Sequence, residues 1–202
     1  MPALAKMKDN EFELAICDPP YGIGMDGQNE DKKHGFRGYE HKGWDKTAPQ
    51  EEYFDTLFRI SKNQIIWGAN HFISKMPKDS SCWIMWNKCQ RDFSFADGEL
   101  AWASFKKAVR IFDFSRGEAL KEKKDFGERH HPTQKPVQLY KWLLQNYAKE
   151  GDKILDTHLG SGSIALACWD LCFDLTAYEI DKDYYDGALA RLERHKSQGQ
   201  LF

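Results

Sequence analysis

Residues 17–24 read CDPPYGIG, in which an aspartate and two prolines directly follow an apolar run. Proline lacks the amide hydrogen that a sheet ladder needs, so Pro19 and Pro20 stop the preceding strand at Asp18. The Asp18 carboxylate and the Pro19 carbonyl could accept hydrogen bonds from both protons of an amino group, and Tyr21 offers a flat face to a base. Such acceptors would steer the nitrogen lone pair toward an electrophile, as methyl transfer to an amine requires. A rigid turn with a tyrosine packed over it is the alternative interpretation.

A second motif, LDTHLGSGS at 155–163, has the form of a glycine-rich turn between a strand and a helix. Gly160 and Gly162 let a ligand approach the backbone, and the following helix N-terminus favours a carboxylate or phosphate, although such turns often serve strand–helix packing alone. Glu179 ends the next expected strand, where it could accept hydrogen bonds from both hydroxyls of a ribose. Because the turn departs from the dinucleotide fingerprint G-x-G-x-x-G, S-adenosylmethionine fits better than a nicotinamide cofactor.

Strands and helices are expected to alternate around these motifs. Apolar runs predict strands at 12–17, 64–68 and 82–87, two strands within 99–114, and one on each side of the glycine-rich turn and its helix. Helical spacing is present in 49–63 and 182–196. Another helix is expected to be capped by Thr133, to carry Pro136 in its first turn and to end at Gly151. This alternation predicts one α/β domain over 1–202, with a mostly parallel, twisted, doubly wound sheet and helices on both faces.

Composition narrows the class of protein. The chain has 202 residues, enough for one domain with a substantial core, and a net charge of −2 that requires neither a nucleic-acid nor an acidic partner. Its five cysteines are an odd set without a C-x-x-C pair, which argues against a disulfide framework or a zinc site and favours a reducing compartment. No signal peptide and no apolar run of membrane-spanning length is present, so we expect a cytoplasmic protein without a membrane partner.

Two charged, glycine-containing stretches, at 28–43 and 115–131, have no obvious core role. The first directly follows the DPPY motif and could grip DNA phosphates, whereas the alternative is that both are solvated surface loops. Four basic residues are the candidate DNA contacts: Lys32, Lys33, Arg37 and Lys42.

The order of DPPY at 18–21, HPTQKP at 131–136 and LDTHLGSGS at 155–163 resembles the beta group of amino DNA methyltransferases. The likeness covers nearly the whole chain, and the chain resembles the compact adenine enzymes of phages and prophages. It implies a Rossmann-like methyltransferase fold with a circularly permuted motif order, S-adenosylmethionine as donor, a target adenine flipped out of double-stranded DNA, and no metal. In such relatives a further strand precedes the stretch equivalent to residues 1–21, so we expect the fold to lack one N-terminal strand.

The resemblance also assigns roles to residues. Those expected to hold the target base are Asp18, Pro19, Pro20 and Tyr21. Those expected to bind the cofactor are Asp156, Thr157, His158, Gly160, Ser161, Gly162, Ser163 and Glu179, with Thr133, Gln134 and Lys135 near its methionine end. Where this chain reads Asp156-Thr157-His158, family members commonly read DPF, a departure that leaves the turn intact.

Several functional alternatives stay open at this point. DPPY favours adenine N6 as the methyl acceptor, because cytosine-specific relatives more often have serine at the Asp18 position. Cytosine N4 is the second candidate. A shortened, inactive relative that only binds DNA is a third. The tail QGQLF resembles peptides that dock on bacterial sliding clamps, with Gln198, Leu201 and Phe202 at the anchor positions. The recognition sequence, a homodimeric state and a role in restriction, regulation or phage protection are not indicated by the residues.

Overall fold

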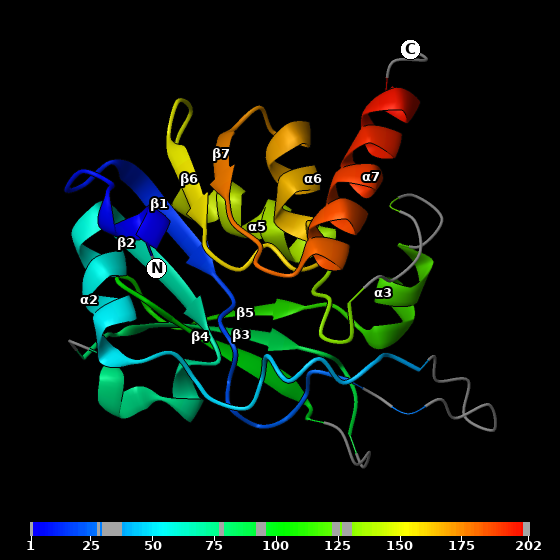
Figure 1. The fold of residues 1–202 in the computed structure, drawn as a ribbon, viewed down its shortest axis with the longest axis horizontal. Helices are drawn as coiled ribbons and strands as arrows, with labels where there is room; N and C mark the ends of the chain where they lie inside the picture. Colours follow the sequence, from blue (N-terminus) through cyan, green and yellow to red (C-terminus); the bar gives the residue numbers. More distant parts are fainter. Residues whose placement is uncertain are drawn as a thin grey trace.

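The structure is a computed structural model that describes residues 2–27, 29, 38–76, 79–91, 96–122, 126 and 131–199. Its described strands form one seven-stranded sheet in the order β5-β3-β4-β2-β1-β6-β7 (Figure 1). The strands are β1 (Phe12–Cys17), β2 (Ser61–Trp67), β3 (Cys82–Asn87), β4 (Gly98–Ala103), β5 (Arg110–Asp113), β6 (Lys153–Asp156) and β7 (Asp174–Ala177).

Helices cover both faces of this sheet, as the sequence predicts. They are α1 (Pro2–Ala5), α2 (Glu51–Ile60), α3 (Arg116–Lys121), α5 (Val137–Tyr147), α6 (Ser163–Asp170) and α7 (Lys182–Gly199), with short 3₁₀ turns η1 (Ala69–His71) and η2 (Ile73–Lys75). Helices α5, α6 and α7 lie on one side of the sheet, and α1 and α2 lie on the other (Figure 1). The doubly wound α/β architecture is therefore confirmed.

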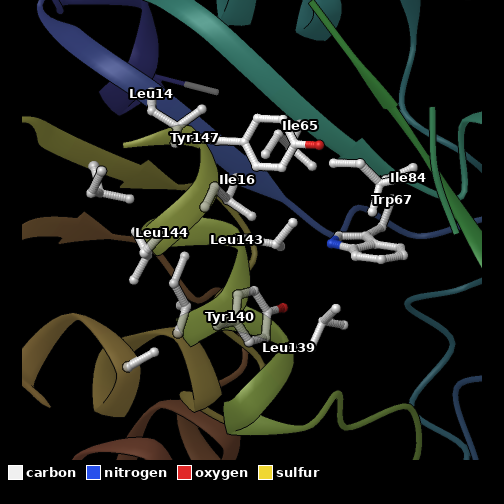
Figure 2. Close-up of a cluster of buried hydrophobic side chains, with 14 of the residues drawn as sticks. Leu14, Ile16, Ile65, Trp67, Ile84, Leu139, Tyr140, Leu143, Leu144 and Tyr147 are labelled. Atoms are coloured by element: carbon white, nitrogen blue, oxygen red, sulfur yellow. The ribbon is translucent and has the colours of Figure 1, made fainter. Parts of the chain in front are cut away.

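Strand β1 lies near the middle of the sheet and is buried on both faces. Leu14 and Ile16 pack toward α5 (Figure 2), whereas Ala15 and Cys17 pack toward α2. A strand covered on both sides needs apolar residues at successive positions, which explains the apolar run LAIC at residues 14–17. The strand that leads into the DPPY turn is thus fixed by the core itself.

The sheet is parallel except for one strand. β1 pairs in parallel with β2 and β6, β6 with β7, and β3 with β5, whereas β4 is antiparallel to both β2 and β3. The start of β4 therefore lies at the same edge of the sheet as the ends of the other strands. Figure 1 also shows the sheet twist, because β3 and β5 cross the direction of β1 and β2. In the described residues β7 pairs with β6 alone and is one edge of the sheet.

The boundaries expected for two helices are wrong. The helix expected over 49–63 ends at Ile60, and β2 starts at Ser61 rather than at residue 64. The helix expected to be capped by Thr133 starts at Val137, with Pro136 at its N-cap, and ends at Tyr147. Its first amides are satisfied by a residue that is distant in sequence.

That residue is Glu122, whose carboxylate accepts hydrogen bonds from the Val137 and Gln138 amides at 3.1 and 3.0 Å. A carboxylate at this position also complements the positive end of the helix dipole. Thr133 therefore has no capping role, and Gly151 belongs to the turn before β6, where its φ of +84° suits glycine.

Candidate active site

A cavity of about 780 Å³ lies at the edge of the sheet where β1, β6 and β7 end. Ligand clefts of open α/β sheets occur at this edge, and this volume is in the usual range for small-molecule sites. Its lining includes Asp18 and Tyr21 from the first motif, Gly160 and Ser161 from the glycine-rich turn, and Glu179. The structure thus brings residues that are more than 130 positions apart onto one cavity.

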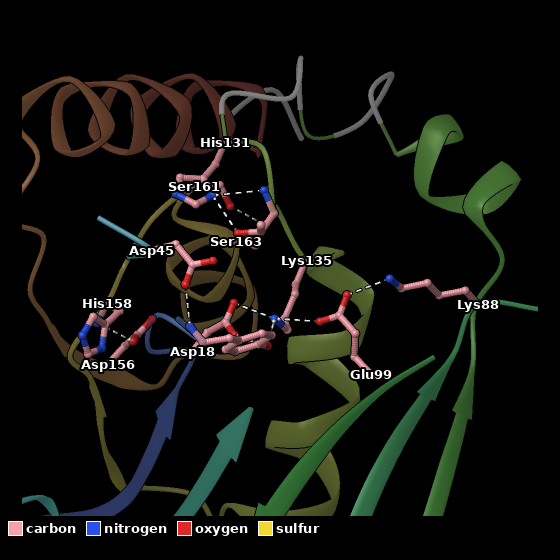
Figure 3. A network of polar contacts seen from close by, with 12 residues as sticks. Asp18, Asp45, Lys88, Glu99, His131, Lys135, Asp156, His158, Ser161 and Ser163 are labelled. Carbon is pink, nitrogen blue, oxygen red and sulfur yellow. Dashed lines mark hydrogen bonds and ion pairs between the residues drawn. The ribbon is translucent and has the colours of Figure 1, made fainter. Parts of the chain in front are cut away.

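Asp18 is at one end of a chain of charged side chains (Figure 3). Its Oδ2 lies 2.6 Å from the Lys135 ammonium, which also lies 3.0 Å from Glu99 Oε2. The other oxygen of Glu99 lies 2.8 Å from the Lys88 ammonium. Lys135 is only 2% exposed, so its charge is balanced inside the protein by two carboxylates.

Burial and charge pull the pKa values of this chain in opposite directions. Burial raises the pKa of Asp18 above its ordinary value, although the Lys135 ammonium lowers it, and the Glu99 carboxylate raises it further. Burial also acts to raise the pKa of Glu99, but Lys135 and Lys88 outweigh it and lower the value to about 2. Burial acts to lower the pKa of Lys135, but Asp18 and Glu99 raise it overall. Glu99 and Lys135 are therefore charged at neutral pH.

Tyr21 is fixed at both ends. Its hydroxyl donates to Asp18 Oδ1 at 2.8 Å, and its ring stacks on His71 with centroids 5.1 Å apart and an interplanar angle of 15°. A Cβ built on Gly68 would lie 2.0 Å from the Tyr21 ring, so the tyrosine occupies space that only glycine leaves open. The flat ring expected from the sequence therefore has a second aromatic ring behind it.

The backbone of the DPPY turn is held by Asp45, a residue that the sequence analysis missed. Its carboxylate accepts hydrogen bonds from the amides of Tyr21, Gly22 and Met25 at 2.6, 2.8 and 2.7 Å. Asp45 is 2% exposed, and a buried carboxylate with three backbone donors is well satisfied. No local signal indicates this role because the contacts span 20 to 24 residues.

The glycine-rich turn is shaped by its own backbone. Gly160 and Gly162 have φ values of +51° and +74°, and a Cβ on Gly162 would lie 2.9 Å from the Ala188 side chain of α7. Arg191 of α7 is 2% exposed and donates to the carbonyl of Ser161 and the hydroxyl of Ser163. Arg191 is the second residue missed from the sequence, because it lies 30 positions from the turn that it supports.

The predicted cofactor residues fall into two groups. Those that line the cavity are Thr133, Gln134, Lys135, His158, Gly160, Ser161 and Glu179. Those outside the lining are Asp156, Thr157, Gly162 and Ser163. In the second group, Asp156 and Thr157 support the turn through hydrogen bonds, and Gly162 packs against α7.

Asp156 is 1% exposed and accepts a hydrogen bond from the His158 amide at 2.9 Å. Burial raises its pKa to about 8. Thr157 is hydrogen bonded to the Tyr53 hydroxyl at 2.7 Å and to His158 Nδ1 at 2.9 Å. Burial lowers the pKa of His158 to about 4, so its imidazole is neutral at physiological pH.

Glu179 lies two residues after the end of β7 and on the cavity, as expected. Its Oε2 accepts from the Gly160 amide at 2.7 Å, and its Oε1 accepts from the Asp181 amide at 2.9 Å. A carboxylate has about four acceptor positions, so two remain for ribose hydroxyls. Lys135, in contrast, contacts the side of the cavity formed by Asp18 and Glu99 rather than the glycine-rich turn.

Among the candidate DNA contacts, only Lys42 belongs to the described residues; Lys32, Lys33 and Arg37 lie outside them. The Lys42 ammonium bridges Asp181 and Asp183 at 2.8 and 2.7 Å and is 18% exposed. In this conformation its charge pairs with the start of α7. Of the three anchor residues in the clamp-like tail, Gln198 lies in α7, and Leu201 and Phe202 lie outside the described residues.

The described residues contain no group of three or more His, Cys, Asp or Glu side chains placed to hold a metal ion. Within the same part of the chain, no helix is long and apolar enough to cross a membrane.

Comparison with known proteins agrees with this geometry. A family model described as "DNA methylase" matches residues 101–190. The type II methyltransferase M.HpaI of Haemophilus parainfluenzae is 25% identical over 95% of this chain and 71% of its own length. The type II methyltransferase M2.DpnII of Streptococcus pneumoniae is 25% identical over 94% of this chain and 85% of its own length.

Solved structures show the same fold. The structure of M1.HpyAVI with SAM matches with a TM-score of 0.57 and 21% identity over 91% of this chain and 90% of the other. The cytosine-N4-specific PvuII DNA methyltransferase matches with a TM-score of 0.60 and 12% identity over 96% of this chain and 86% of the other. The Rossmann-like fold is thus confirmed. In sequence and in fold the chain is similar to DNA methyltransferases, which supports the resemblance indicated by its motifs.

Proposed function

We propose that this protein transfers a methyl group from S-adenosylmethionine to the exocyclic N6 amine of adenine in DNA. The single observation that carries the proposal is the convergence of Asp18 with the glycine-rich turn and Glu179 on one cavity. An acceptor for an amine and a site for a nucleoside cofactor are the two parts that this reaction requires. The match to the DNA methylase family model supports DNA as the substrate.

The residues present fit S-adenosylmethionine. Gly160, with positive φ, leaves the backbone of the turn open to a ligand, and the cavity is large enough for a nucleoside. The free acceptor positions of Glu179 suit a ribose. Six residues would line the cofactor side: Thr133, Gln134, His158, Gly160, Ser161 and Glu179. When bound, the cofactor supplies an electrophilic methyl group on a sulfonium centre.

The chain's own residues position the amine. The Asp18 carboxylate and the Pro19 carbonyl accept hydrogen bonds from its two N–H groups, and the prolines keep both acceptors still. Since Lys135 already occupies Asp18 Oδ2, the amine shares or replaces the Tyr21 hydroxyl at Oδ1. The Tyr21 ring, backed by His71, provides a surface on which a base taken out of the duplex stacks. Basic residues around Lys32, Lys33 and Arg37 would contact the DNA backbone.

The test is incubation of the purified chain with unmethylated genomic DNA and deuteromethyl-labelled S-adenosylmethionine, followed by nucleoside mass spectrometry. We expect labelled N6-methyladenine, and a loss of about 1,000-fold in rate for Asp18→Asn, because the amide no longer carries an acceptor charge at the reacting nitrogen. Calorimetric titration of the same variant should show unchanged cofactor binding. Asp152→Asn, an acidic residue that does not line the cavity, is the matched control and should retain full activity.

Cytosine N4 is the second candidate target, supported by the fold match to a cytosine-N4-specific enzyme. The same experiment separates the two, because it would yield labelled N4-methylcytosine instead. Cofactor binding without any methylated base would favour the inactive DNA-binding relative and would refute the proposed activity.

A further inference from the structure

Glu99 is a charged residue on the cavity that no motif identifies. It is the second residue of β4 and pairs in register with Trp86 of β3. Because β4 runs opposite to its neighbours, its first residues lie at the edge where the other strands end. This reversal brings the Glu99 carboxylate to the Lys135 ammonium, which in turn contacts Asp18 (Figure 3).

The geometry places Lys135 between two carboxylates rather than on one. Its ammonium lies 2.6 Å from Asp18 Oδ2 and 3.0 Å from Glu99 Oε2, and it also donates to the Tyr21 hydroxyl at 3.1 Å. An ammonium has three protons, so these three contacts use all of them. The position of the Lys135 ammonium therefore depends on Glu99 as well as on Asp18. The orientation of the Asp18 carboxylate depends in turn on the position of this ammonium.

Glu99 is in turn held by a further cation. Its second oxygen lies 2.8 Å from Lys88, whose ammonium lies over the Trp86 ring at 5.0 Å from the centroid. The four charges alternate in sign from Asp18 to Lys88 and sum to zero. A balanced, partly buried set of charges loses its balance when any one member is removed.

We propose that Glu99 is a positioning residue for Asp18, which acts through Lys135 to orient the reacting carboxylate and to divide the charge of the lysine between two partners. The kinetic part of this inference rests on the proposed function, whereas the electrostatic part does not.

Five ionisable groups face Asp18 from the surrounding elements: Lys135, Glu99, Tyr21, Tyr140 of α5 and Asp156 of β6. Burial raises the pKa of both tyrosines well above the ordinary value and raises that of Asp156 to about 8. At neutral pH the tyrosines are uncharged and Asp156 is mostly protonated. Lys135 and Glu99 are therefore the members of this set that impose full charges on Asp18.

Removal of either charge should shift the pKa of Asp18, and the two removals should shift it in opposite directions. Loss of the Glu99 carboxylate leaves the lysine charge to Asp18 alone and lowers the pKa of Asp18. Loss of the Lys135 ammonium leaves Asp18 beside an unbalanced carboxylate and raises the pKa. A purely structural role for Glu99 would reduce stability without this pair of opposite shifts.

The experiment is a carboxyl-carbon NMR titration of the full chain labelled with ¹³C-aspartate, with the Asp18 signal assigned by its absence in Asp18→Asn. We expect Glu99→Gln to lower the pKa of Asp18, Lys135→Met to raise it, and the double variant to return close to wild type. Glu150→Gln, an exposed glutamate in the turn after α5, is the matched control and should change nothing. An unchanged Asp18 titration in Glu99→Gln, or shifts of both single variants in one direction, would overturn the proposal.

Kinetics add a second readout. We expect kcat for Glu99→Gln to fall about 10–100-fold, the loss typical of a misplaced reacting group, with unchanged cofactor affinity and an acidic limb of the pH profile displaced to lower pH. Opposite NMR shifts in a chain that forms no methylated base would support the positioning role of Glu99 and refute the proposed activity, so the two failures are distinguishable.

Discussion

The DPPY turn and the glycine-rich turn lie on the same cavity but are held in different ways. Carboxylates hold the first: Asp45 binds three of its amides, and Asp18 is paired with Lys135. Backbone conformation shapes the second, with Gly162 packed against α7 and Arg191 bonded to a carbonyl of the turn. We therefore expect substitutions that change charge to act mainly on the Asp18 side of the cavity. Substitutions that change shape should act mainly on the side of the glycine-rich turn.

A steric change on the DPPY side of the cavity should also reduce activity. Gly68→Ala places a Cβ within 2.0 Å of the Tyr21 ring and must displace the tyrosine. We expect kcat to fall about 100-fold, because displacement of a positioning group by an ångström has effects of this size. Steady-state methylation assays with a duplex substrate measure it.

Gly24→Ala is the matched control for this substitution. The two glycines have nearly equal φ values, +70° and +73°, but a Cβ on Gly24 would meet nothing within 4 Å. Equal losses of kcat in both variants would mean that backbone strain, and not the position of Tyr21, causes the effect.

On the other side of the cavity, the glycine-rich turn should depend on Arg191. Arg191→Met removes hydrogen bonds to the Phe126 and Ser161 carbonyls and the Ser163 hydroxyl. We expect the free energy of unfolding to fall by about 2 kcal/mol, because buried acceptors lose their donors, and cofactor binding to weaken. Urea unfolding and calorimetry measure the two effects. Arg194→Met, an exposed arginine on the same helix, should leave both unchanged, and an equal loss there would contradict the assigned role.

The third prediction concerns pH. Burial raises the pKa of Asp156 in the folded protein to about 8, above the ordinary value of 3.8. Between these values the folded state binds more protons than the unfolded state, so this group makes stability fall as pH rises. Asp156→Asn should therefore unfold like wild type near pH 4 and become more stable than wild type by about 1 kcal/mol or more by pH 8. A constant difference across this range, measured by urea titration, would contradict the raised pKa.

The smallest effect is expected for Lys42→Met. Lys42 pairs with Asp181 and Asp183, which raise its pKa, but Asp183 is 84% exposed and water screens the pair. We expect a loss of at most about 1 kcal/mol in the free energy of unfolding, which disappears in 1 M salt. A loss that persists at high salt would point to packing of the lysine chain on Tyr184 instead.

The sequence predicts the parts of the fold and site that depend on local patterns. The apolar run of β1, the prolines that end it and the glycines of the second turn all carry their structural reason within a few residues. The residues that support the site do not: Glu122 caps α5 from 15 positions away, and Asp45 and Arg191 contact turns 20 or more positions away. Such contacts depend on tertiary packing, which no local pattern records.

The role of Glu99 could not be predicted from the sequence either, because it depends on the tertiary structure. Within the sequence it is an acidic residue at the start of a strand, with nothing to distinguish it from a solvated one. Only the reversed direction of β4 brings it to Lys135, which the motif alone assigned to the cofactor side.

The reversal of β4 has a further consequence for protein engineering. Since β3 ends at Asn87 and β4 begins at Gly98, the connection between them leaves and rejoins the sheet beside the cavity, where Lys88 and Ala96 line it. A segment grafted between these strands would lie directly beside the cavity without any change in strand register, and longer loops cost little closure entropy. This connection is therefore a natural acceptor site for foreign recognition modules.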